Sequence, residues 1–136
     1  GLVRELGIEK IVPFAGFRND MARCVHAFDI SVLPSIGCET SSFSIKESMA
    51  ARIPVIVSDH GGLPEIVADS VEGYVTYAGD AASIAVALRQ MLEHPDLRHR
   101  MGVNARVRVL REFSQEHFAK KTEEAYRRAL AFHGER

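Results

Sequence analysis

Two glutamates, Glu39 and Glu47, stand eight positions apart and have the residue type and spacing to do chemistry. A carboxylate accepts hydrogen bonds from neighbouring hydroxyl groups, so one glutamate could hold a sugar and the other a ribose, with a diphosphate between them. The side chains that separate them are small and polar, which lets a ligand approach the backbone closely; they include Thr40, Ser41, Ser42 and Ser44.

A strand, a loop and a helix must position these glutamates. Residues 30–33 have the pattern of a short buried strand that ends at Pro34, and the spacing of Ile45, Met49 and Ala50 predicts a helix over residues 44–52. In a doubly wound sheet such loops lie at the carboxyl ends of strands, where the first amides of a helix can bind a phosphate. The pattern therefore predicts an anion site between Glu39 and Glu47.

A structural explanation fits the same residues. Ser44 and Glu47 match a capping box, with Ser44 as the N-cap and Glu47 as the third helical residue. Glu39 would then be a solvated carboxylate in a loop. The local pattern alone leaves both interpretations open.

Several linked motifs after Pro34 resemble the signature of the retaining glycosyltransferases with the GT-B fold, the glycogen-synthase-like glycosyl transferases group 1. That family carries two glutamates separated by seven residues, a helix that begins Glu-Ala-Met-Ala, a strand like Pro-Val-Ile-Val-Ser-Asp and a Gly-Gly-x-Pro-Glu-Ile-Val turn. The matching segments are residues 39–47, 47–50, 54–59 and 61–67, in the same order and at the same distances.

The resemblance implies a role for individual residues. Glu39 would hold donor-sugar hydroxyls near the reacting carbon, and Glu47 would bind the ribose of the donor. The resemblance implies no metal or other cofactor, and the nucleoside-diphosphate sugar is the donor substrate. The remaining implied contacts are the diphosphate-binding amides of Ser42, Phe43, Ser44 and Ile45, and a loop beside the donor base that carries Phe17 and Arg18.

One departure from the family pattern predicts a backbone conformation. Arg52 stands where the family usually has glycine, at a helix end where glycine commonly supplies a left-handed residue. The substitution is expected to cost up to about 1 kcal/mol without touching the proposed chemistry.

Composition bounds the remaining classes. The chain has 136 residues, 46% of them hydrophobic, and a formal net charge of -1, so it is expected to form one domain without a nucleic-acid surface. Cys24 and Cys38 do not suggest a disulfide framework, and no apolar run is long enough to cross a membrane. We expect a cytoplasmic protein, which in its full-length parent could be peripheral at the membrane.

Strand-like and helical segments alternate along the chain, which predicts an α/β fold with a mainly parallel, Rossmann-like sheet. Four strands are expected, over residues 11–15, 30–33, 54–58 and 73–77. The last helix, over about residues 115–132, has an apolar face that is consistent with packing over the sheet: Phe118, Ala125, Tyr126 and Ala129. By resemblance, part of this face would instead meet the absent amino-terminal domain. The arginines of residues 98–111 are expected to form a solvated or intrahelically paired face.

By resemblance, residues 1–136 are a partial donor-binding domain, without the amino-terminal acceptor domain and the first strands of the sheet. The full-length parent is expected to transfer a hexose-like group to a hydroxyl acceptor, carbohydrate or lipid-linked, and the fragment alone to be inactive. Two alternatives remain: a noncatalytic nucleotide-sugar-binding or interaction module, and a fragment of an epimerase of related fold.

Overall fold

The computed structural model describes residues 1–134 of the chain. Three strands form one sheet: β1 (Ser31–Leu33), β2 (Val55–Ser58) and β3 (Gly73–Thr76). The helices are α1 (Leu2–Glu5), α2 (Met21–Val25), α3 (Phe43–Ala50), α4 (Leu63–Ile66), α5 (Ala81–Glu93), α6 (Pro95–Glu112) and α7 (Gln115–Gly134).

The sheet is parallel throughout, in the order β1-β2-β3. Val55 of β2 pairs with Ser31 of β1 on one side and with Gly73 of β3 on the other. Parallel neighbours require crossover connections, which here contain α3 and α4. The predicted α/β fold with a parallel sheet is confirmed.

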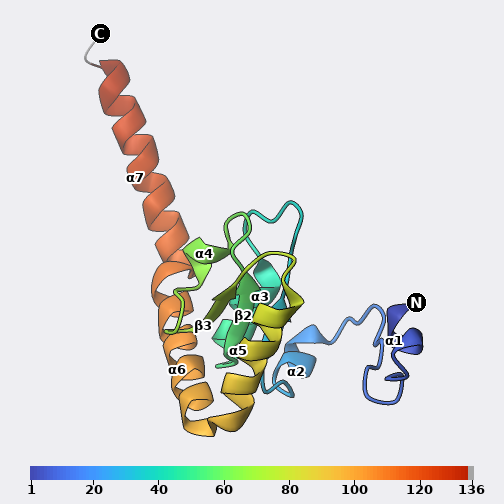
Figure 1. The fold of residues 1–136 in the computed structure, drawn as a ribbon. Coiled ribbons are helices and arrows are strands. Elements are labelled where there is room, and N and C mark those ends of the chain that lie inside the picture. Colours follow the sequence, from blue (N-terminus) through green and yellow to red (C-terminus); the bar gives the residue numbers. More distant parts are fainter. Residues whose placement is uncertain (135–136) are drawn as a thin grey trace.

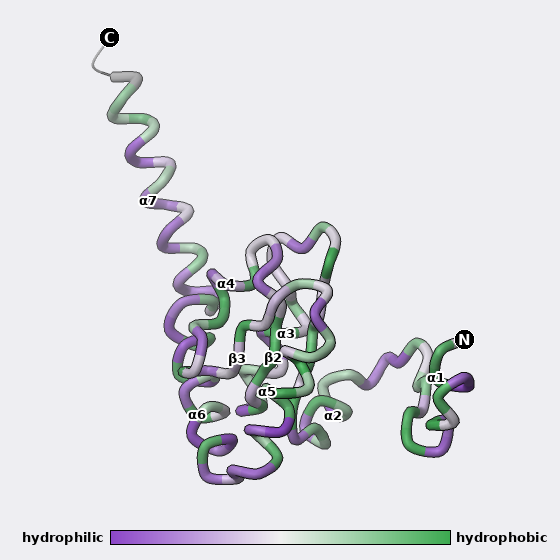
Figure 2. Tube along the Cα trace, in the orientation of Figure 1, coloured by the Kyte–Doolittle hydropathy of each residue, from purple (hydrophilic) through white to green (hydrophobic). Residues whose placement is uncertain are grey.

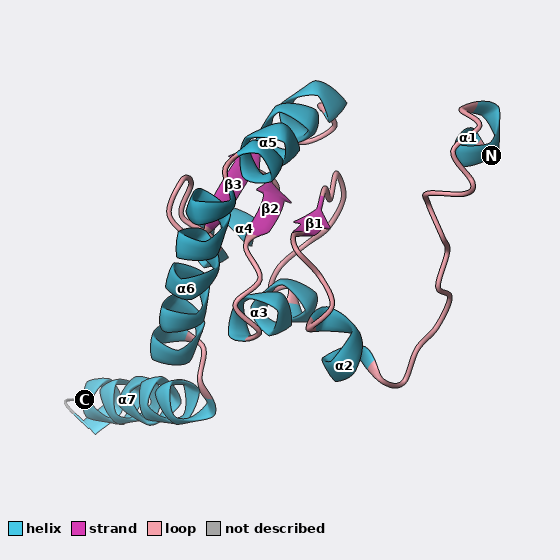
Figure 3. Ribbon diagram, turned by 90° about the horizontal axis from the view of Figure 1, so that it is seen from below, coloured by secondary structure: helices cyan, strands magenta, loops and turns pink. Residues whose placement is uncertain are grey.

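The central strand is buried on both faces, as its β-branched sequence predicts (Figure 3). Val55 and Val57 belong to a core with residues of α3, α4 and α6, whereas Ile56 between them packs with α5 and with Met101 of α6. Alternate side chains of a strand point to opposite faces, so helices cover both sides of β2. This sandwich holds the carboxyl ends of the strands in place.

The strand predicted over residues 11–15 does not form, and the prediction of four strands is wrong by that one element. The segment lies apart from the sheet (Figure 1), with Ile11 75% and Phe14 84% exposed. A strand needs a neighbour to satisfy its backbone groups, and within residues 1–134 β1 is hydrogen-bonded to β2 alone. Residues 11–15 have the apolar pattern of a strand, but no strand of residues 1–134 lies beside them to pair with.

Helix α7 projects away from the body of the molecule (Figure 1), so the expectation that it packs over the sheet is wrong. Its hydrophobic and hydrophilic residues alternate along the projecting part (Figure 2), and Phe118 is 71% and Tyr126 69% exposed. Helical periodicity predicts an apolar stripe but does not say which surface covers it. Within the described residues, we find no helix long and apolar enough to cross a membrane.

The arginines of α6 were expected to be solvated or paired within the helix, and several instead bind other elements. Arg98 donates to the carbonyl of Met91, and Arg106 donates to that of Ala50 at the end of α3. Arg108 donates to the carbonyl of Glu65 at 2.9 Å, and it also pairs with Glu112 one turn along the helix. The basic face of α6 therefore fixes neighbouring segments to the body.

Candidate functional site

A loop of residues 34–42 leaves the carboxyl end of β1 and enters α3, as predicted. The N-cap is Ser42, not Ser44: the side-chain oxygen of Ser42 accepts a hydrogen bond from the amide of Ile45 at 3.3 Å. Ser44 is the second helical residue, and its hydroxyl lies 2.9 Å from that of Ser42. Glu47 is then the fifth helical residue, too far along for a capping box. The structural explanation for Glu47 is therefore wrong.

The first turn of α3 supplies backbone donors beside the loop of residues 34–42. The amides of Phe43 and Ser44 have no acceptor within the helix, because the first turn lacks a preceding one. The amide of Ile45 already donates to Ser42, and the side chains of Ser42 and Ile45 are buried. Phe43 is 77% exposed, so the helix presents its free amides beside an open surface.

The glycine turn after β2 packs directly on the loop that carries Glu39. The amide of Gly62 donates to the carbonyl of Glu39 at 3.0 Å. A Cβ atom on Gly61 would lie 1.9 Å from that same oxygen, and one on Gly62 would lie 2.1 Å from the carbonyl oxygen of Thr40. Gly61 also has a φ of +59°, which side chains with a Cβ rarely adopt. The two glycines therefore set the position of Glu39.

A second contact anchors the start of the same loop. The hydroxyl of Ser58, at the end of β2, donates to the carbonyl of Ser35 at 2.6 Å. Ser58 is buried, so this hydrogen bond is shielded from water. The half-buried Glu39 is thus carried by a loop that the sheet holds at two points.

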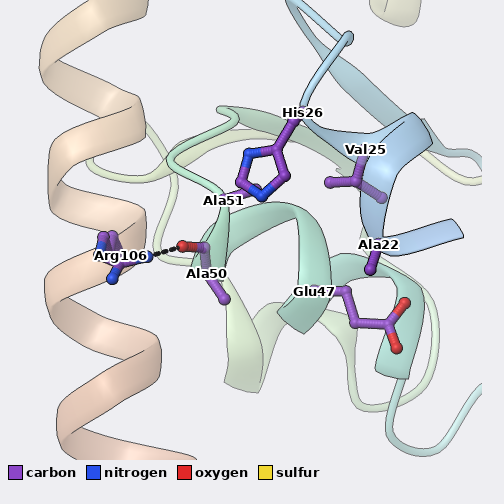
Figure 4. A pocket seen from close by; sticks show the side chains of 7 residues that line it. All are labelled: Ala22, Val25, His26, Glu47, Ala50, Ala51 and Arg106. Carbon is purple, nitrogen blue, oxygen red and sulfur yellow. Dashed lines mark hydrogen bonds between the residues drawn. The ribbon is translucent and has the colours of Figure 1, made fainter.

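Glu47 faces the short helix α2 across a cavity of about 260 Å³ (Figure 4). Residues of α2 and α3 line most of this cavity, which also contains the exposed His26; the lining residues are Ala22, Val25, His26, Glu47, Ala50, Ala51 and Arg106. Among these lining residues Glu47 is the one acidic group, and Glu39 lies outside the set. The structure therefore presents the two carboxylates from different elements, Glu39 from the loop and Glu47 from the helix.

His26 is an exposed residue that forms the C-cap of α2, and it also lines the cavity that Glu47 lines. The sequence motifs that singled out Glu47 lie outside α2, which is a helix of five residues. Only the packing of α2 against α3 brings His26 to the cavity that Glu47 lines.

Phe17 and Arg18 lie in the segment that precedes α2. The side chain of Phe17 is 98% exposed. The guanidinium of Arg18 pairs with the carboxylate of Asp20 through two hydrogen bonds of 2.8 and 2.6 Å. The exposed Phe17 and the Arg18–Asp20 pair do not involve the loop of residues 34–42. The role that resemblance implies for Phe17 and Arg18 therefore stays a prediction.

We expect the Arg18–Asp20 pair to appear in an acid titration. The hydrogen bonds from Arg18 lower the pKa of the Asp20 carboxyl below its ordinary value. A depressed folded-state pKa gives a stabilising contribution that is present above the unfolded-state pKa and lost as the pH falls through the folded-state pKa. In Arg18→Met, side-chain NMR should show Asp20 titrating at higher pH, and an unchanged pKa would contradict the pairing in solution.

Histidine, cysteine and acidic side chains do not gather into a group of three that could hold a metal ion anywhere in residues 1–134. The acidic residues of the site, Glu39 and Glu47, stand on separate elements.

Comparison with known proteins gives consistent matches along the chain. The model of a family described as "Glycosyl transferases group 1" matches residues 1–108. The N-acetyl-alpha-D-glucosaminyl L-malate synthase of Bacillus anthracis is 32% identical over 127 residues, which are 92% of this chain and 32% of that protein. The chain spans about a third of the length of the curated relatives it matches.

Solved structures match the fold. The Anabaena HepE structure in complex with UDP-glucose superposes with a TM-score of 0.85 at 26% identity, over 91% of this chain and 34% of that one. The carboxy-terminal domain of the glycosyl transferase group 1 family protein LpcC from Francisella tularensis superposes with a TM-score of 0.73 at 26% identity, over 84% of this chain and 60% of that one.

Proposed function

This chain belongs to the glycosyl transferases group 1 family, and from that premise we propose that it forms part of a nucleotide-sugar donor site. In a full-length parent the site would serve retaining transfer of a hexose-like group to a hydroxyl acceptor. The amino-terminal acceptor domain and the first strands of the donor domain would lie in the rest of that parent. The observation that carries the proposal is the Glu39 loop, packed on Gly61 and Gly62 at the carboxyl end of the sheet.

The donor would lie across the start of α3. The amides of Phe43 and Ser44 offer N–H groups and the positive end of the helix to a diphosphate. The carboxylate of Glu47 accepts hydrogen bonds from the ribose hydroxyls, and that of Glu39 accepts them from the donor sugar. A likeness in fold to HepE, whose structure contains UDP-glucose, supports this class of ligand.

These groups suit the charge that develops in the reaction. When the bond between the sugar and the diphosphate breaks, negative charge grows on the leaving phosphate. Fixed amides at the start of α3 stabilise that charge without having to reorient. Glu39 lies on a loop held by the sheet, so it keeps its place at the sugar end while the bond breaks.

Titration of the chain with nucleoside diphosphates and with nucleotide sugars, followed through backbone amide shifts, tests the proposal. We expect weak binding that shifts the amides of residues 42–47. Glu47→Gln should weaken binding of both ligand types about tenfold, because it loses a charge-assisted hydrogen bond. Glu39→Gln should weaken binding of the nucleotide sugar by a similar factor and leave the nucleoside diphosphate unaffected.

Glu93→Gln provides a matched control, since Glu93 is exposed at the far end of α5. This variant should bind like the wild type. Shifts that avoid residues 42–47, or equal losses for Glu93 and Glu47 variants, would contradict the site. In a full-length parent, transfer that falls sharply with Glu39→Ala distinguishes a transferase from a pure binder, and isomerisation of the nucleotide sugar without transfer would favour the epimerase.

A further inference from the structure

Lys46 of α3 connects the Glu39 loop to the end of α6. Its ammonium donates to the hydroxyl of Ser41 at 2.5 Å. The same nitrogen lies 4.9 Å from the centre of the Phe113 ring and 5.5 Å from that of Phe43. Phe113 follows the last residue of α6 and packs against the hydrophobic core, so it is a fixed support for the cation.

These contacts attach the backbone of residues 39–41 to the glycine turn on one side and to α3 on the other. On the sheet side, the carbonyl of Glu39 accepts from the amide of Gly62. On the helix side, Ser41 is held by Lys46, and the next residue, Ser42, caps α3. Glu39 therefore lies at one end of a three-residue segment that is hydrogen-bonded at both ends.

We propose that Lys46 is a positioning residue of the donor site, which keeps Glu39 in register with the sugar end of the donor by holding Ser41. The inference rests on the proposed function. Lys46 is next to Glu47 in sequence, but the ammonium is committed to Ser41 and to two aromatic rings. Its effect on the ligand is therefore transmitted through the loop and not through a direct contact with phosphate.

The experiment compares Lys46→Met, which removes the charge and keeps an unbranched side chain one atom shorter, with Lys46→Arg, which keeps the cation. Lys120→Met on the projecting helix α7 is the matched control, since Lys120 is exposed. The first readout needs no ligand: hydrogen exchange of the Gly62 amide, whose acceptor is the carbonyl of Glu39. We expect exchange to be about tenfold faster in Lys46→Met and unchanged in Lys46→Arg and Lys120→Met.

The second readout is the affinity for two probes, UDP and UDP-glucose. Lys46→Met should weaken UDP-glucose binding about tenfold and change UDP binding by less than about twofold, with Lys46→Arg restoring both. This split separates positioning from a general loss of stability, which would lower both affinities together.

Each contrary outcome has its own meaning. Equal losses for UDP and UDP-glucose would overturn the inference, because Lys46 would then act on the phosphates directly or on the stability of the whole chain. Unchanged exchange of the Gly62 amide in Lys46→Met would overturn it as well, because the loop would not depend on Lys46. If the wild-type chain bound neither probe while exchange still responded to Lys46→Met, the proposed function would be the part refuted, and the donor role of Lys46 would be refuted with it.

Discussion

Replacing Gly61 with alanine is expected to lower the free energy of unfolding by about 3 kcal/mol and to weaken nucleotide-sugar binding by at least about tenfold. Two causes act together. The new Cβ would lie 1.9 Å from the carbonyl oxygen of Glu39, a backbone atom that cannot move without moving the loop. The φ of +59° adds about 1–2 kcal/mol for a residue with a Cβ.

Three other glycines separate these causes. Gly62→Ala introduces a contact, 2.1 Å from the Thr40 oxygen, at a negative φ of -84°, and should cost about 1–3 kcal/mol. Gly16→Ala places a Cβ at a residue with a φ of +64° and open space around it, and should cost about 1 kcal/mol. Gly37→Ala meets neither a close contact nor a positive φ, and its free energy of unfolding should stay within about 0.5 kcal/mol of the wild-type value.

Urea unfolding of the four variants measures the costs, and titration with UDP-glucose measures the effect on the site. The result that contradicts the prediction is a Gly61 variant no less stable than the Gly16 variant. In that case the contact between the glycine turn and the Glu39 loop does not persist in solution, and the site loses its support from the sheet.

Replacing Glu72 with alanine is expected to destabilise the chain by about 3–5 kcal/mol, a large part of the stability of a domain of this size. The side chain of Glu72 is 6% exposed and that of Arg108 is 18% exposed, and they pair at 3.3 Å. The same carboxylate oxygen accepts from the amide of Ala68 at 2.7 Å. Removing Glu72 leaves the Arg108 charge and the Ala68 amide without that partner inside the fold.

Matched variants test the explanation. Glu123→Ala removes an exposed partner of Arg127 on α7 and should cost less than about 1 kcal/mol. The double variant Glu72→Ala, Arg108→Ala should lose less than the sum of the two single variants, because either single variant already breaks the pair between them. Denaturant midpoints measure all four proteins. Additive losses would show that Glu72 and Arg108 act independently.

The sequence predicted what local chemistry decides. Residues 30–33 and 54–58 have a strand pattern and a helix pattern follows the first of them, and the structure has β1, β2 and α3 there within two residues. The left-handed residue expected at Arg52 is confirmed by its φ of 65°. Ser114, directly before α7, accepts a hydrogen bond from the amide of His117 three positions along the chain. Each of these features depends on neighbours within a few positions.

Features that depend on distant partners were not predictable in the same way. Residues 11–15 have the pattern of a strand but no adjacent strand among residues 1–134, and they stay exposed. The N-cap is Ser42 and not the predicted Ser44, because α3 begins at Phe43 and it is the Ser42 oxygen that accepts from the amide of Ile45. No pattern in the sequence linked Lys46 to Phe113 or Glu47 to His26.

The sequence by itself therefore determined the family, the parallel α/β architecture, and the two glutamates with a helix start between them. Only the tertiary structure decided how the Glu39 loop is supported, which cavity Glu47 enters, and which charges pair across elements. The physical reason is the range of each interaction. Hydrogen bonds and steric preferences within a few residues depend on residues that are adjacent in the sequence. Contacts between distant segments form only once the chain has packed.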